Sequence, residues 1–142
     1  MSAATVRPLP RLVPLAADHA EAAAALVVAG ITRLRERVPV LPAAWTDEAV
    51  VARLVRALAD RGNGMALVHE DGALAGFQAA TMLDGHGGRW AYTPDVGHAT
   101  AAAGRAVRTR GGAGSAGLLG AERAIERLYA ALAERWVREA CV

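Results

Sequence analysis

The spacing of apolar residues predicts two helices in the first half of the chain. The first is expected to begin at Asp18, a capping residue followed by Glu21, and to end before Pro39. The second is expected to begin after Thr46 and to end at Gly62, because glycine accepts the left-handed conformation that closes a helix. The expected buried stripes are Val27, Ile31, Leu34 and Val38 in the first helix, and Val51, Leu54, Val55 and Leu58 in the second.

Short segments of apolar and β-branched residues predict strands on both sides of these helices. Thr5–Leu9 is expected to be a short edge strand, since proline is tolerated there. Residues 65–93 are expected to form an antiparallel meander with tight turns at residues 71–72 and 84–88. The three strands of this meander are Met65–Glu70, Ala73–Leu83 and Arg89–Thr93.

Glycine dominates the segment after the predicted meander. No period is visible from Asp95 to Gly120, and residues 104–120 are expected to be a flexible loop rich in glycine and alanine. A last helix is predicted from about Ala121 to Ala140, with an ion pair between Glu134 and Arg138. Its expected stripe is Ile125, Leu128, Leu132 and Trp136. The order β-α-α-β-β-β-loop-α predicts an α+β fold in a single domain, residues 1–142.

Composition narrows the classes of protein that this chain can belong to. Hydrophobic residues make up 54% of the 142 residues, which is enough to form a packed core. The net charge of +2 argues against a nucleic-acid partner, and all 16 basic residues are arginine, as a GC-rich coding sequence would favour. One cysteine, Cys141, and prolines near the N-terminus fit a cytoplasmic chain without a signal peptide or membrane span. The histidines are scattered, so no metal site is expected.

Three stretches carry a likeness to a known family. They are residues 40–46 (VLPAAWT), residues 71–77 (DGALAGF), and residues 91–98 (AYTPDVGH) taken together with residues 128–136 (LYAALAERW). In this order they resemble the first half of the GNAT superfamily of N-acetyltransferases. Residues 91–98 and 128–136 together resemble the fourth strand and the following helix of a subset of bacterial members.

The resemblance implies transfer of an acetyl group from acetyl-CoA to an amine, which the sequence does not identify. In the family the thioester lies between the fourth and fifth strands, and a motif of the form Q/R-x-x-G-x-G/A binds the pyrophosphate through backbone amides. Residues 108–113 fit this formula, so the cofactor-binding residues it implies are Arg108, Gly111, Gly112 and Ala113. Residues 114–120 separate the match from the predicted helix, and a glycine-rich insertion remains the alternative interpretation.

Two residues after the predicted fourth strand are candidates for catalysis. Because a carboxylate near this strand can be the base in the family, Asp95 is a candidate, and His98 is a second because histidine can take a proton near neutral pH. The alternative is that His98 only stabilises a turn. Trp90 and Tyr92 on the same strand are expected to be core residues.

The family fold continues beyond the helix at 121–140 with further strands and another helix. The 142 residues alone are therefore expected to be a truncated or inactive form that transfers acetyl groups slowly or not at all. The open edge of the fourth strand is expected to favour self-association. A binding or dimerisation module derived from the same fold is the alternative function, and a gene product without a selected function is a third.

Overall fold

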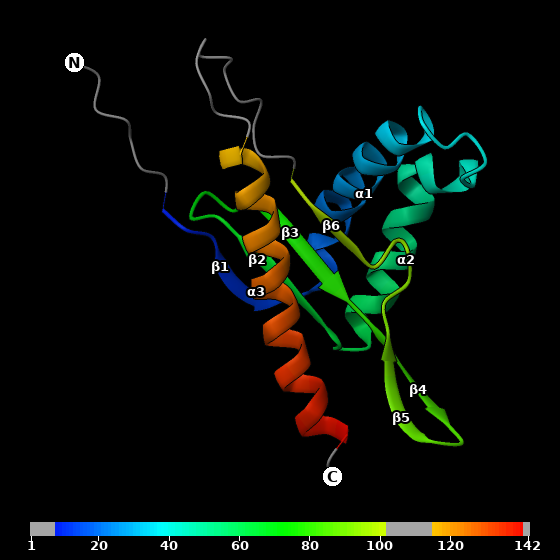
Figure 1. Ribbon diagram of the computed structural model, residues 1–142, viewed down its shortest axis with the longest axis vertical. Coiled ribbons are helices and arrows are strands. Elements are labelled where there is room, and N and C mark those ends of the chain that lie inside the picture. The colour runs from blue at the N-terminus through cyan, green and yellow to red at the C-terminus, as the bar shows by residue number, and fades with distance from the viewer. Residues whose placement is uncertain (1–7, 102–114, 141–142) are drawn as a thin grey trace.

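The computed structural model describes residues 8–101 and 115–140, and within them the chain forms an α+β fold with antiparallel sheets. The main sheet has four strands and lies between helices, and a separate hairpin projects from one corner (Figure 1). The helices are α1 (Ala20–Arg35), α2 (Glu48–Asp60) and α3 (Ser115–Ala140), with 3₁₀ turns at Ala17–His19 and Ala43–Thr46. The strands are β1 (Arg11–Pro14), β2 (Gly64–Val68), β3 (Leu74–Ala79), β4 (Thr81–Gly85), β5 (Gly88–Tyr92) and β6 (His98–Thr100).

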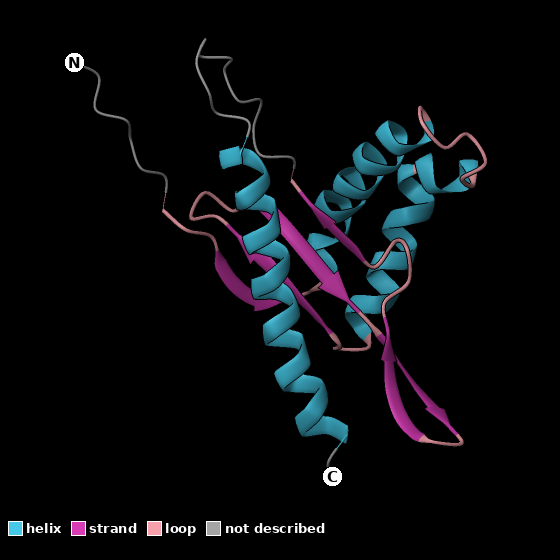
Figure 2. Ribbon diagram, in the orientation of Figure 1, coloured by secondary structure: helices cyan, strands magenta, loops and turns pink. Residues whose placement is uncertain are grey.

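The four-stranded sheet has the order β1-β2-β3-β6, and every neighbouring pair is antiparallel. Helices α1 and α2 cover one face of this sheet and α3 crosses the other, as the coloured ribbons show (Figure 2). Side chains alternate between the two faces along each strand. Phe77 therefore joins the core with α1 and α2, whereas Leu67, on the other face, lies towards α3.

The helices confirm part of the predicted stripes. In α1 the buried positions are alanines together with Val27, whereas Leu34 and Val38 lie at the surface. In α2, Val51, Val55 and Leu58 are buried, but Leu54 is 43% exposed, contrary to the prediction. The other four buried α2 residues each lie three or four positions from Val55, and Leu54 lies just beyond the edge of that stripe.

The predicted helix starts were wrong by one or two residues. The 3₁₀ turn before α1 is stabilised by the imidazole Nδ1 of His19, which accepts a hydrogen bond of 3.0 Å from the backbone N–H of Ala16. The N-cap residue of α1 is His19 and not the predicted Asp18. At α2 the cap is Asp47 rather than Thr46, because one Asp47 oxygen accepts from the N–H groups of Ala49 and Val50. The predicted end of α2 is confirmed: Gly62 follows the helix with φ of +73°.

The three-stranded meander was wrong in its third strand. The first turn is confirmed, with Gly72 at φ of +83°, but the predicted strand Ala73–Leu83 divides at Ala80. The N–H of Ala80 donates to the carbonyl of Asn63 at 3.0 Å, and the chain then leaves the sheet. Strands β4 and β5 pair only with each other, and β6 takes the place beside β3.

Two further predictions outside the meander are tested only in part. Strand β1 lies at Arg11–Pro14, and Pro8 and Leu9 of the predicted strand Thr5–Leu9 precede it and are not strand; residues 5–7 lie outside the described residues. The aperiodic segment contains β6 and the first turns of α3, so residues 115–120 are helical and not a loop. Residues 102–114 lie outside the described residues, and the loop prediction there stays a prediction.

Helix α3 packs through the middle of its predicted stripe. Leu128 and Leu132 are buried against the sheet, Trp136 is partly buried, and Ile125 is 49% exposed. The predicted pair of Glu134 and Arg138 is confirmed by a separation of 3.4 Å between its charged atoms. None of the helices in the described part of the chain is both long and apolar enough to cross a membrane.

Candidate functional site

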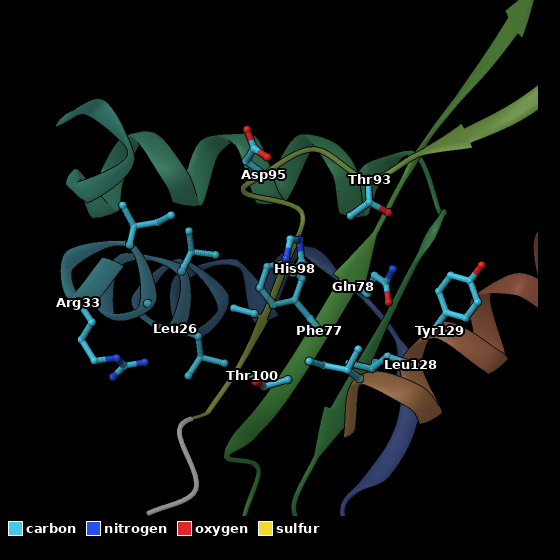
Figure 3. Close-up of a pocket in the computed structure, with 15 residues that line it drawn as sticks. Leu26, Arg33, Phe77, Gln78, Thr93, Asp95, His98, Thr100, Leu128 and Tyr129 are labelled. Atoms are coloured by element: carbon cyan, nitrogen blue, oxygen red, sulfur yellow. The ribbon is translucent and has the colours of Figure 1, made fainter. Parts of the chain in front are cut away.

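A cavity of about 500 Å³ surrounds the outer edge of β6. Its wall combines side chains from α1 on one face of the sheet and from α3 on the other, so the edge strand runs between the two helix layers (Figure 3). The lining residues are Leu26, Val27, Gly30, Ile31, Arg33, Phe77, Gln78, Thr93, Asp95, His98, Ala99, Thr100, Ile125, Leu128 and Tyr129.

A tight turn immediately before β6 positions Asp95. The N–H of Gly97 donates to the carbonyl of Pro94 at 2.8 Å, which closes a four-residue turn with Asp95 and Val96 at its centre. Val96 is buried and anchors the turn, whereas the Asp95 side chain is exposed. The sequence Pro-Asp-Val-Gly therefore presents a carboxylate at the cavity from a well-anchored loop.

Gly97 allows this turn to approach the sheet closely. Its carbonyl accepts a hydrogen bond of 2.7 Å from the N–H of Ala79 at the end of β3. A Cβ atom at this position would lie 2.9 Å from the carbonyl oxygen of Ala79 and 2.9 Å from Cδ of Pro94. Only glycine fits without a shift of backbone or ring, and His98 follows directly as the first residue of β6.

Among the described residues, β6 pairs with β3 alone and no strand lies on its other edge. The register places Ala99 opposite Phe77, and the flanking bonds from Ala79 to Gly97 and from Ala101 to Ala75 show which groups face β3. Because the direction alternates along an antiparallel strand, the N–H and C=O groups of His98 and Thr100 point away from β3. These four backbone groups line the open edge.

The polar side chains of the cavity lie along β6 and beside it. In Figure 3, Asp95, His98 and Thr100 follow one another along the chain, and Arg33 lies to the side of the strand, on α1 (Figure 3). Within the described residues, the side chains of Asp95, His98 and Arg33 make no hydrogen bond or ion pair. They are therefore available to a bound molecule.

Apolar residues form the walls between these polar side chains. Leu26, Val27 and Ile31 of α1 line one side, and Ile125 and Tyr129 of α3 line the other. Ile125 and Tyr129 are 49% and 59% exposed. An extended ligand lying along β6 would cover this apolar surface and remove it from water.

The cavity contains both candidate catalytic residues that the sequence indicated. Asp95 and His98 both line it; the sequence placed them after the strand 89–93, and in the structure Asp95 lies in a turn and His98 begins β6. The candidate cofactor-binding residues Arg108, Gly111, Gly112 and Ala113 lie outside the described residues.

Other lining residues were not predicted. Arg33, Gln78 and Thr100 lie outside the stretches that resemble the family, and Thr93 lies inside one without having been singled out; only knowledge of which strand borders β3 brings these residues together. Arg33 lies between Ile31 and Leu34 of the predicted stripe, off the apolar face of its helix, and the sequence offers no other signal for it. The expected core positions Trp90 and Tyr92 were wrong: both are about half exposed on the projecting hairpin, at 55% and 49%.

A second groove lies between α2 and the base of this hairpin. Its volume is about 380 Å³, and Trp45, Leu54 and Tyr92 contribute apolar surface to it. The Arg61 guanidinium donates to the hydroxyl of Thr81 at 3.2 Å and ties the hairpin to α2. Asp95 also lines this groove, so the turn before β6 separates the two hollows.

Comparisons of the chain with protein-family models, with curated proteins and with solved structures returned no match.

Proposed function

We propose that this chain binds acetyl-CoA along the open edge of β6 and acts as an N-acetyltransferase of the GNAT type. The observation that carries the proposal is the cavity around β6, which combines free backbone groups, apolar walls and the pair Asp95 and His98. The element order supports it as well. If β6 is taken as the family's fourth strand and β4–β5 as an inserted hairpin, the described elements follow the order that the resemblance implies.

The open edge of β6 suits the chemistry of an acyl-CoA. The arm that carries the thioester is extended and contains amide groups, which can exchange hydrogen bonds with backbone N–H and C=O groups as an added strand does. His98 and Thr100 offer two of each along β6. The apolar residues of α1 and α3 would pack against the methylene groups of the arm.

Asp95 and His98 are suited to deprotonating the acceptor. An amine reaches the cavity mostly as its ammonium form, and the imidazole of His98 or the carboxylate of Asp95 would remove one proton. The neutral nitrogen then attacks the thioester carbonyl carbon, the new C–N bond forms, and the C–S bond breaks. The thiolate leaves and is protonated, so that one amide, one free CoA thiol and one proton are released.

Binding is the first test of this proposal. Acetyl-CoA titrated into the protein should raise its melting temperature, because a ligand that binds only the folded state stabilises it. Replacing Thr100 with proline removes one outward N–H without touching the bonds to β3, and should weaken binding. Thr100→Val retains that N–H and is the matched control. Equal binding by both variants, or no shift with the wild type, would contradict the proposal.

Catalysis needs a separate test, with acetyl-CoA and a panel of amines as substrates. His98→Ala and Asp95→Asn should each lower the rate of acetyl transfer by about 10²-fold if the replaced group is the base, while acetyl-CoA still binds. A rate unchanged in both variants would remove these residues from the mechanism and leave binding alone.

A second candidate function is a non-catalytic module that pairs with another chain through β6. The same open edge favours it, because unpaired strand edges flanked by exposed apolar residues such as Ile125 and Tyr129 accept an added strand. Light scattering distinguishes the two candidates. A dimer that acetyl-CoA does not dissociate, and that Thr100→Pro converts to a monomer, would support the module.

A further inference from the structure

Arg33 is a positively charged side chain that lines the cavity around β6. It lies in the last turn of α1 and is exposed to solvent. Figure 3 shows it on α1, to the side of β6 and away from Asp95 (Figure 3). The cavity wall therefore carries a carboxylate and an imidazole in one part and a guanidinium in another.

Other arginines near the same helices have structural partners. The Arg35 guanidinium donates to the carbonyl of Leu41, and that of Arg56 pairs with Glu21. Arg33 makes no such contact within the described residues. Near the end of a helix a cation also interacts favourably with the helix dipole, but this effect does not require the side chain to line a cavity.

The direction of β6 relates these groups to one another. The strand runs from His98 to Thr100, away from Asp95, and Arg33 lies beside it on α1 (Figure 3). An acyl-CoA whose thioester lies beside His98 and whose arm follows the strand would carry its phosphates towards Arg33. An acceptor amine, by contrast, has to approach the thioester near Asp95 and His98.

We propose that Arg33 binds a phosphate group of the acyl-CoA and so determines the direction in which the cofactor lies along β6. The proposal rests on the proposed function, since it assumes that an acyl-CoA occupies the cavity. The planar guanidinium can donate two parallel hydrogen bonds to phosphate oxygens, and its charge is permanent at neutral pH.

The test compares two thioesters that share the arm and differ in the phosphate-bearing part. Acetyl-CoA and S-acetylpantetheine are titrated by calorimetry into the wild type, Arg33→Ala and Arg33→Lys. Arg37→Ala is the matched control, because Arg37 is also exposed, carries the same charge and does not line the cavity. Circular dichroism and melting temperature establish that each variant is folded.

Arg33→Ala should raise the Kd for acetyl-CoA about tenfold, the effect of losing a hydrogen bond to a charged group at an exposed site. The Kd for S-acetylpantetheine should stay unchanged. For acetyl-CoA, Arg33→Lys should lose less affinity than Arg33→Ala, and Arg37→Ala should have the Kd of the wild type. Added salt should also weaken acetyl-CoA binding more in the wild type than in Arg33→Ala.

Three results would overturn the inference. If Arg33→Ala binds acetyl-CoA like the wild type, the phosphates lie elsewhere while the proposed function stands. If Arg33→Ala weakens the binding of both thioesters equally, Arg33 contacts the arm or stabilises the fold and does not bind phosphate. If the wild type binds neither thioester, the proposed function itself fails, and the role of Arg33 fails with it.

Discussion

Replacing Leu58 with alanine should destabilise the protein far more than the same replacement at Leu54, one turn earlier in α2. Leu58 is 6% exposed and belongs to the core against the sheet, whereas Leu54 is 43% exposed at the rim of a groove. The two substitutions change helix propensity equally, so any difference between them reports burial alone.

The expected magnitudes follow from the area that each side chain buries. Truncating a buried leucine removes about three carbon groups at roughly 0.8 kcal/mol each and leaves a cavity, for a loss of about 3 kcal/mol. At Leu54 water can fill the space and less area is lost, so the expected cost is about 1 kcal/mol or less. With 142 residues, the entropy of unfolding is about 0.3 kcal/mol/K, and Leu58→Ala should lower the melting temperature by about 10 °C.

Urea titration followed by tryptophan fluorescence is the appropriate assay. Three tryptophans are present, and Trp45 packs against the same core as Leu58. The midpoint should fall clearly in Leu58→Ala and only slightly in Leu54→Ala, with the same slope in both. Equal losses in the two variants would refute the placement of α2 on the sheet, and would favour the stripe that the sequence predicted.

Three further predictions concern the other helix start, the turn beside the site and the hairpin. Asp47→Ala should cost about 1 kcal/mol in urea unfolding, because two helix N–H groups lose their acceptor, and Thr46→Ala should cost less. Gly97→Ala should lower the free energy of unfolding by about 1–3 kcal/mol, because the new Cβ would push the turn away from the carbonyl of Ala79. Gly87→Ala, with open space around it, should change the free energy of unfolding by about 0.5 kcal/mol or less. In hydrogen exchange, amides of β4 and β5 should exchange faster than those of β2 and β3, since an isolated two-stranded hairpin is marginally stable in water.

Local chemistry allowed the end of α2 and the first hairpin turn to be predicted. Gly62 and Gly72 both adopt positive φ, a conformation that glycine reaches without steric cost, so these positions depend on few neighbours. The cap at Asp47 was missed because Thr46 and Asp47 are both capping residues, and only the path of the chain selects between them.

The pairing of strands that are distant in sequence could not be predicted from the sequence pattern. The run 73–83 is apolar except for Gln78 and Thr81 and carries no turn signal at Ala80, where it divides; the N–H of Ala80 there donates to the carbonyl of Asn63 from another segment. Strand β6 has only three residues and follows a turn, which is too short for a periodic signal. Asp95 and His98 could be nominated because they follow the predicted strand in the stretch that resembles the family's fourth strand, but Arg33 and Tyr129 join them only through the sheet order.

The hairpin β4–β5 lies in sequence between β3 and β6, which are neighbours in the main sheet. The length of the hairpin can therefore change without changing how β3 and β6 pair. Thr81 and Tyr92 are cross-strand partners at its base, so residues 82–91 can be exchanged for a two-residue turn without moving either end. Residues 93–98, which carry the turn and the candidate base, keep their attachment to Ala79. The chain thus has a position where sequence can be inserted, shortened or replaced by a foreign peptide while the register of the central sheet is preserved.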